Sequence, residues 1–171
     1  MKLGCFSGVL VLVLIASAPS PAQNAKPKIS DLKLREAVAK YEEAMAKFND
    51  GDADPMIACW SKREDALQLG PAGGYEGKGI AEIGRQAKLI ASRSKERGFK
   101  FTYEYVSVVE TKEMAYVVLI NRRTEPSAEK QEGRTLAFRS TNVFRLEDGE
   151  WKMVLQHGDT LVNSRRPPEK K

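Results

Sequence analysis

The last third of the chain carries two long segments of alternating polarity that meet at Asp148-Gly149. One face of residues 135–146 carries Leu136, Phe138, Ser140, Asn142, Phe144 and Leu146. One face of residues 151–161 carries Trp151, Met153, Leu155, His157, Asp159 and Leu161. Period-two alternation around Asp-Gly predicts two β-strands joined by a tight hairpin turn. A two-residue turn sets Ser140 opposite His157 and Asn142 opposite Leu155.

The segment before the hairpin begins with a helical pattern. Ser30 and Asp31 are good capping residues, and an apolar stripe with spacings of three and four follows them. The stripe consists of Leu34, Val38, Tyr41, Met45 and Phe48. The polar residues 49–52 end this helix. Asp54 and Pro55 then favour a short second helix that runs to Trp60.

The middle of the chain adds one more helix and the remaining strands. Residues 66–69 are a short strand candidate, and the Gly-rich residues 70–79 read as turns. A second apolar helical stripe begins at Ile80 and predicts a helix to Arg97, which Gly98 ends. Residues 100–110 and 114–124 have strand patterns, and residues 125–133 form a charged loop. This order predicts an α+β fold with helices on one face of a strongly curved mixed or antiparallel sheet, with room for a cavity between the two layers.

The two ends of the chain differ in character from its centre. Lys2, an apolar run and small residues before Gln23 have the anatomy of a secretory signal peptide, and a retained anchor is the alternative. We therefore expect a signal peptide at 1–22, a polar leader at 23–30, one domain at 31–162 and a basic flexible tail at 163–171. This organisation predicts a periplasmic or secreted protein with no membrane attachment after cleavage.

Charge and cysteine content narrow the classes of function. The net charge is +5, but basic and acidic residues are interleaved, whereas nucleic-acid binders gather their basic residues into a patch. We therefore expect no nucleic-acid partner. Signal cleavage leaves Cys59 as the single cysteine, in an apolar setting typical of a buried, inert thiol. One histidine and one cysteine do not make a usual zinc ligand set, so we expect no metal and no other cofactor.

Three local sequences together resemble the SnoaL-like branch of the nuclear transport factor 2-like superfamily. They are residues 49–60 after the first helix, residues 75–80 before the later helix, and the closing hairpin at 145–157 with its Trp151 and His157. The resemblance implies a cystatin-like, cone-shaped α+β barrel with a pocket at its wide end. It also implies a homodimer formed through the outer face of the sheet. It implies no single activity, because relatives include isomerases, cyclases, hydrolases and kinase oligomerisation domains.

His157 is the main candidate for catalysis, with Asp159 two residues further along the same predicted face. A histidine beside a carboxylate can act as a general base. The alternative is a histidine that is simply hydrogen-bonded in or near the core. Both readings place its side chain on the inner, apolar face of the sheet.

Candidate ligand-binding residues are mixed aromatic and polar. The aromatic set consists of Tyr41, Trp60, Tyr103 and Tyr105, and core packing is the alternative for each. The polar set consists of Asn121, Ser140, Asn142 and His157. In kinase-association relatives two inward arginines bind acidic groups, and Asn121 and Asn142 fall at those positions, which argues against an acidic ligand. Arg122, Arg123 or Arg139 would replace the missing inward arginines only if a bulge turned one of them inward.

These observations leave three hypotheses for function. The first is an exported domain that binds a small, largely apolar molecule in the cone pocket without catalysis. The second is an isomerase, cyclase or hydrolase that uses His157 as general base. The third is a homo-oligomerisation module that presents its sheet to a partner.

Overall fold

The computed structural model describes residues 28–70, 76–95, 98–126 and 135–161. The helices of this part are α1 (Leu32–Asn49), α2 (Asp54–Ala58) and α3 (Gly79–Ser94). Its strands are β1 (Leu67–Leu69), β2 (Glu76–Lys78), β3 (Lys100–Glu110), β4 (Met114–Thr124), β5 (Thr135–Glu147) and β6 (Glu150–Thr160). The predicted signal peptide, the leader up to residue 27 and the tail from 163 lie outside the described residues.

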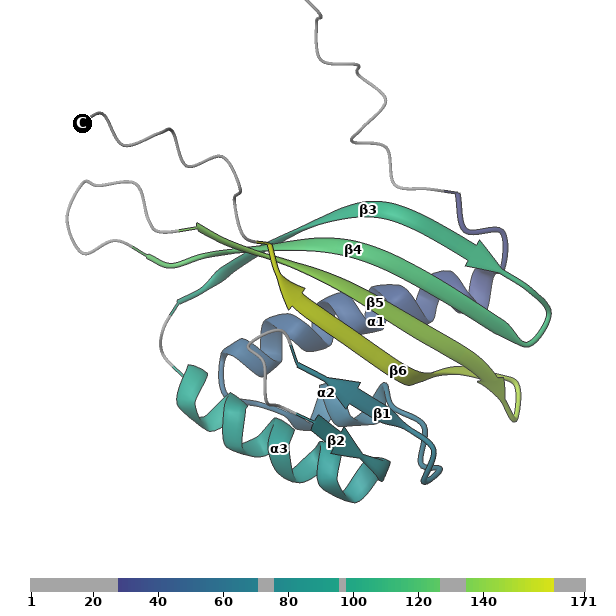
Figure 1. Ribbon diagram of the computed structural model, residues 1–171, viewed down its shortest axis with the longest axis horizontal. Helices are drawn as coiled ribbons and strands as arrows, with labels where there is room; N and C mark the ends of the chain where they lie inside the picture. Colours follow the sequence, from purple (N-terminus) through teal and green to yellow (C-terminus); the bar gives the residue numbers. More distant parts are fainter. Residues whose placement is uncertain (1–27, 71–75, 96–97, 127–134, 162–171) are drawn as a thin grey trace, which may run out of the picture.

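The six strands form one mixed sheet in the order β2-β1-β6-β5-β4-β3. Neighbouring strands are antiparallel except for β1 and β6, which run parallel. Figure 1 shows the long strands β3 to β6 curving across α1, with α2 and α3 beside the short strands β1 and β2. The predicted α+β class is therefore confirmed, and the helices pack on the inner face of the sheet.

The helices begin and end largely where the sequence predicts. The side chain of Asp31 accepts a hydrogen bond from the backbone N–H of Leu34 at 3.0 Å and caps α1. The predicted stripe turns Leu34, Val38 and Tyr41 into the core. α3 ends at Ser94, one turn before the predicted end at Arg97.

The Gly-rich segment contains a strand that the sequence pattern does not reveal. Glu76–Lys78 pairs with β1 as edge strand β2, so the prediction of turns throughout 70–79 is wrong there. Gly77 is buried beneath α3, and a Cβ on it would lie 3.2 Å from the side chain of Ile83. This close approach of helix and strand favours glycine, because a Cβ would be tighter against Ile83 than most real Cβ contacts.

A bulge in β6 changes the face to which its second half points. The tight turn at Asp148-Gly149 pairs Glu147 with Glu150 as predicted. The register then shifts, because Phe144 pairs with Met153 and Val143 pairs with Leu155, which leaves Val154 as an extra residue.

The bulge makes the predicted pairing wrong by one residue. Ser140 pairs with Gly158 instead of His157, and Asn142 pairs with Gln156 instead of Leu155. Because strand side chains alternate, this shift turns Gln156 inward and His157 outward.

Trp60 joins α2 to the centre of the sheet. Its side chain is only 2% exposed, and its backbone forms an isolated parallel bridge to Met153 of β6. Backbone hydrogen bonds of 2.9 Å on either side, from Ser61 to Met153 and from Met153 to Cys59, hold this junction. In the part of the chain that the structure describes, no helix is long and apolar enough to cross a membrane.

Candidate functional site

A cavity of about 200 Å³ lies between the inner face of the sheet and the helices. Its apolar walls come from all three helices and from β3 and β5. They include Met45, Phe48, Met56, Ile90, Phe101 and Phe138. Tyr41 and Trp60, two of the predicted aromatic residues, also line this cavity.

Part of the cavity wall is a network of hydrogen-bonded amides and one hydroxyl. Gln68 donates to the side-chain oxygen of Gln156 at 2.8 Å. The nitrogen of Gln156 donates to the hydroxyl of Tyr41 at 2.9 Å and to the side-chain oxygen of Asn142 at 3.1 Å. Asn142 is 1% exposed and does not line the cavity. Asn142 therefore fixes the side chain of Gln156 without lining the cavity itself, and Gln156 supplies polar surface to the cavity wall.

Tyr41 is fully buried within this network. Burial raises the pKa of its phenol to about 12, although hydrogen bonds from Asn142 and Gln156 oppose the rise. The hydroxyl therefore stays protonated throughout the physiological range. It is a neutral hydrogen-bonding group and not a proton acceptor at neutral pH.

A second group of polar residues lies on the inner faces of β4 and β5. The side-chain nitrogen of Asn121 donates to the hydroxyl of Ser140 at 2.9 Å, and both residues are buried and line the cavity. Arg123 follows Asn121 on the same face and also lines the cavity. Simple alternation turns Arg123 inward, so the expectation that only a bulge could do so is wrong.

The guanidinium of Arg123 is held by aromatic and acidic neighbours. Its central carbon lies 4.5 Å from the ring centroid of Phe99 and 5.7 Å from that of Phe138. It also forms an ion pair with Glu125 at 3.0 Å. Of the other two candidate arginines, Arg122 pairs with Glu104 at 2.7 Å. Arg139 also borders the cavity, but its guanidinium pairs with Asp159 at 2.8 Å.

His157 is exposed on the outer face of the sheet and is not among the residues that line the cavity. Asp159 is on the same outer face, where Arg139 donates two hydrogen bonds to its carboxylate. The predicted inner-face position of His157 and Asp159 is therefore wrong, and the cause is the bulge at Val154. This placement removes the geometric basis for His157 as a base acting on a ligand in the cavity.

Tyr103 and Tyr105 do not line the cavity either. Both pack against the core from β3, and Tyr105 borders a separate depression with Arg35 and Val38. The hydroxyl of Tyr105 donates to the carboxylate of Glu42. Burial is the main cause that raises the pKa of both phenols.

The structure thus brings Tyr41, Trp60, Asn121 and Ser140 to one cavity and adds residues that the sequence analysis missed. Gln68 and Gln156 are the main additions, and Arg123, which the sequence analysis made conditional on a bulge, is the third. Gln68 occupies the middle of a three-residue strand, and its pairing with Gln156 carries no local sequence signal. Arg123 was detectable, since it lies two residues from an inward Asn121.

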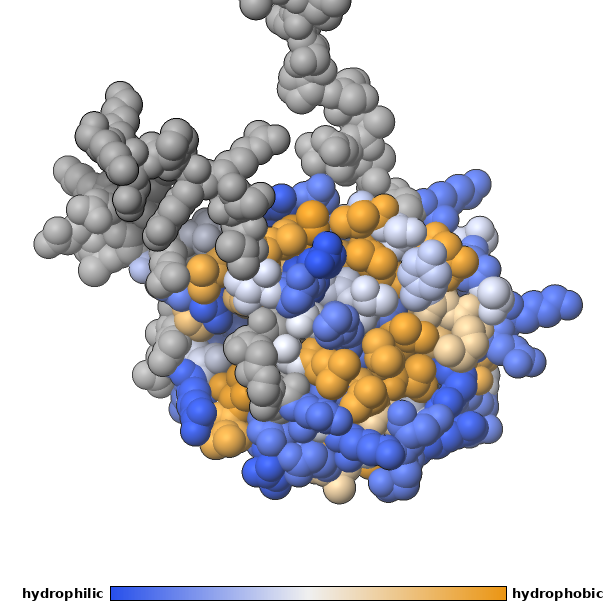
Figure 2. All heavy atoms as spheres, viewed as in Figure 1, coloured by the Kyte–Doolittle hydropathy of each residue, from blue (hydrophilic) through white to orange (hydrophobic). Residues whose placement is uncertain are grey.

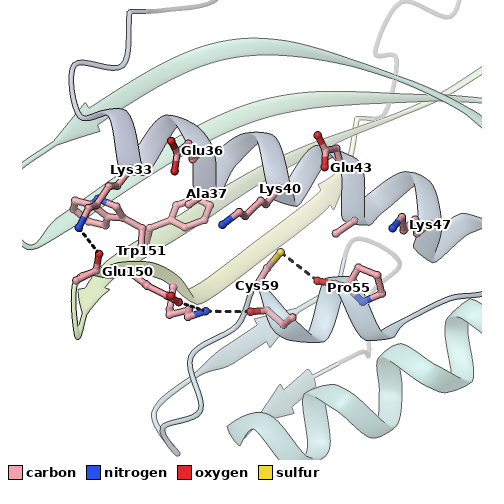
Figure 3. A pocket seen from close by; sticks show the side chains of 15 residues that line it. Lys33, Glu36, Ala37, Lys40, Glu43, Lys47, Pro55, Cys59, Glu150 and Trp151 are labelled. Carbon is pink, nitrogen blue, oxygen red and sulfur yellow. Dashed lines mark hydrogen bonds and ion pairs between the residues drawn. The ribbon is translucent and has the colours of Figure 1, made fainter.

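A larger hollow of about 570 Å³ is an open groove between α1, α2 and the β5–β6 turn. Figure 3 shows Lys40 and Lys47 reaching from α1 over this groove, with Glu36 and Glu43 on the other side of the helix. Lys33 donates to the backbone oxygen of Gly149 at 3.0 Å. Charges of both signs line its rim, so it offers no clear preference for a ligand.

Cys59 lies at the bottom of this groove, where its thiol donates to the backbone oxygen of Pro55 at 3.4 Å. Burial raises the pKa of this thiol, more than nearby Lys152 and Lys40 lower it. A protonated thiol is a poor nucleophile. Among the described residues, no group of three His, Cys, Asp or Glu side chains is arranged to hold a metal ion.

An α+β fold whose helices close a cavity against a curved mixed sheet defines the nuclear transport factor 2-like, or cystatin-like, class. A family model for the SnoaL-like domain matches residues 36–162. The chain therefore belongs to the SnoaL-like domain family. Comparison with curated protein sequences gives no match.

Solved structures support the same fold at low sequence identity. A proposed calcium/calmodulin-dependent protein kinase type II association domain from Thiobacillus denitrificans superposes with a TM-score of 0.63 at 19% identity, covering 75% of this chain and 94% of that one. A proposed dehydratase of the NTF2-like family from Streptomyces avermitilis gives 0.60 at 20% identity, with 76% and 95% covered. A ketosteroid isomerase-like protein from Erwinia carotovora atroseptica gives 0.57 at 20% identity, with 76% and 95% covered. These likenesses establish the fold and leave the activity open.

Proposed function

We propose that this SnoaL-like protein is exported and binds a small, largely apolar molecule in the cavity between sheet and helices, without transforming it. The observation that carries the proposal is the lining of the cavity. Its walls are mainly apolar, and its polar groups are amides, hydroxyls and guanidinium groups. Among the described residues that line it there is no carboxylate and no imidazole, the groups that most often transfer protons.

The size of the cavity limits the ligand. A volume of about 200 Å³ lies below the range of roughly 300–1,000 Å³ that is typical of drug-sized ligands. An apolar cavity of about 150 Å³ holds a benzene ring. The cavity therefore fits a molecule of one or two rings, or a short branched chain, better than a large polycyclic one.

Toluene is a suitable first probe, because it has the right size and no polar group. We expect saturation-transfer NMR to detect binding to the wild-type protein. Gly158 lies on an inward position of β6 and lines the cavity, where a side chain would occupy ligand space. Gly158→Leu should therefore abolish toluene binding, and Ala87→Leu, on the α3 side of the same cavity, should weaken it.

The control for these variants is Lys40→Leu, which adds an apolar side chain to the open groove of Figure 3. It should leave toluene binding unchanged. A wild-type protein that binds neither toluene nor other one-ring probes would contradict the proposed function. Binding that persists in folded Gly158→Leu and Ala87→Leu would place the ligand elsewhere.

Export is the part of this proposal that rests on the sequence alone. The leader has a basic start, an apolar run and small residues near Ala22. N-terminal sequencing of protein recovered outside the cytoplasm should begin at Gln23. A first residue of Met1 would show that the segment is retained.

We also propose that two copies associate through the outer face of the sheet. Val109, Tyr116, Val143 and Leu155 are paired one to the next across β3, β4, β5 and β6. They form the outer apolar row. Figure 2 shows hydrophobic side chains gathered over the strands, with hydrophilic ones along the lower edge. Covering such a row removes apolar surface from water and favours association.

Tyr116→Glu places a charge in the outer apolar row and should convert a dimer to a monomer in light scattering. Tyr116 is 39% exposed in the single chain, so the change leaves the core intact. Leu89→Glu is the matched control, because Leu89 is 41% exposed on α3. A wild-type monomer at micromolar concentration, or a dimer that survives Tyr116→Glu, would contradict the proposed interface.

A further inference from the structure

The inner face of β4 changes from apolar to polar along its length. Ala115, Val117 and Leu119 are buried in the core, and Asn121 and Arg123 continue the same face into the cavity. Asn121 is 7% exposed, so its amide is enclosed by protein on nearly all sides. The polar end of this strand is therefore part of the cavity wall, with Asn121 buried and the side chain of Arg123 27% exposed.

Asn121 and Arg123 each keep one buried polar atom without a hydrogen-bond partner. The nitrogen of Asn121 is bonded to Ser140, but its side-chain oxygen has no partner among the described residues. The terminal nitrogen of Arg123 is bonded to Glu125, but its Nε has no partner in the same part of the chain. Buried donors and acceptors are almost always satisfied in folded proteins, because leaving them unpaired carries a desolvation penalty. A bound molecule in the cavity would supply both partners.

The two atoms without a partner differ in hydrogen-bonding character, because one is an acceptor and the other is a donor. The oxygen of Asn121 accepts a hydrogen bond, and the Nε of Arg123 donates one. The Cα atoms of neighbouring inward residues of a strand lie about 6.7 Å apart, so both side chains border the same part of the cavity. A single small group that donates to Asn121 and accepts from Arg123 would satisfy both atoms.

The charges around this pair favour a neutral group over an anion. Glu125 already neutralises Arg123 at 3.0 Å, so a ligand carboxylate would compete with it. The oxygen of Asn121 would repel a carboxylate, which carries acceptors only. The rings of Phe99 and Phe138 also lie against the guanidinium, at 4.5 and 5.7 Å.

We propose that the ligand carries a neutral polar group with both a donor and an acceptor, such as a primary carboxamide, held between the side-chain oxygen of Asn121 and the Nε of Arg123. Its apolar part lies against Phe48, Trp60 and Phe138. This inference rests on the proposed function and adds the chemical class of the ligand: a one-ring or short-chain carboxamide or a close hydrogen-bonding equivalent.

Three probes of equal ring size test the chemistry: benzamide, benzoate and toluene. Isothermal titration of the wild-type protein should show benzamide binding at least tenfold more tightly than either other probe. Asn121→Leu should weaken benzamide about tenfold, the effect of one hydrogen bond, and should leave toluene binding equal or tighter. Asn121→Asp keeps the acceptor and should retain most of the benzamide affinity.

The matched control is Arg122→Leu, one residue away on the outer face, where Arg122 pairs with Glu104. It should change none of the three affinities. The inference is overturned if benzoate binds as tightly as benzamide, or if Asn121→Leu, shown to be folded by circular dichroism, keeps the wild-type preference for benzamide. Toluene binding that Gly158→Leu abolishes, without any preference for benzamide, refutes the carboxamide class and retains the proposed function. Failure of all three probes refutes both.

Discussion

Replacing Trp60 with alanine is expected to lower the free energy of unfolding by about 3–5 kcal/mol. The indole is almost fully buried, packs in the main core cluster and lines the cavity. Its removal loses the transfer energy of a large aromatic side chain and enlarges the existing cavity, into which α2 has little freedom to collapse because the backbone is bridged to Met153. Urea denaturation followed by circular dichroism measures the change.

Two further variants separate the effect of the indole from a general sensitivity of the fold. Trp60→Phe keeps most of the packed volume and should lose well under half of that free energy. Leu32→Ala changes a residue that is 67% exposed at the start of α1, and should change the stability by less than about 0.5 kcal/mol. A Trp60→Ala protein with wild-type stability would show that packing of the indole contributes little to the stability of the fold.

Raising the pH from 9 to 11 is expected to destabilise the wild-type protein more than Tyr41→Phe, by about 1.4 kcal/mol. The folded-state pKa of Tyr41 is raised from 10.0 to about 12. Between these values the unfolded chain releases the phenolic proton while the folded chain retains it. The unfolded state then binds fewer protons, so stability falls as pH rises. The contribution of Tyr41 to stability is fully present only below the unfolded-state pKa.

Urea denaturation at the two pH values measures this difference directly. Tyr41→Phe should be less stable than wild type at pH 9, by about 1 kcal/mol, because Gln156 loses a hydrogen-bond partner. The gap between the two proteins should then close as the pH rises. Tyr103 and Tyr105 stay in both proteins, so their titration cancels. Parallel pH profiles for the two proteins would show that the Tyr41 phenol ionises as it does in the unfolded chain.

Local sequence patterns were sufficient to predict most elements of this fold. The period of three and four from Leu34 to Phe48 predicts α1, and alternation around Asp148-Gly149 predicts β5 and β6. These signals work because amphipathic periodicity reflects which face each element must bury. The sequence pattern did not predict the short strand β2. Its three residues, Glu76–Lys78, include one glycine and are followed by another, and they owe their extended form to pairing with β1.

The candidate site was predicted only in part. Tyr41, Trp60, Asn121 and Ser140 reach the cavity because each lies on the face that its helix or strand buries. His157 and Asp159 do not, because one extra residue at Val154 reverses the alternation beyond it. Side chains along a strand alternate with a period of two residues. One undetected bulge therefore turns every later residue to the opposite face.

The sequence by itself determined the α+β class, the order of the helices and long strands, and the hairpin turn, since each follows from local periodicity and turn chemistry. Tertiary structure decided which polar side chains face the cavity. Gln68 and Gln156 are 88 residues apart and meet only because β1 runs parallel to β6. Pairing between distant strands and the position of a bulge depend on packing across the whole sheet, which local patterns do not encode.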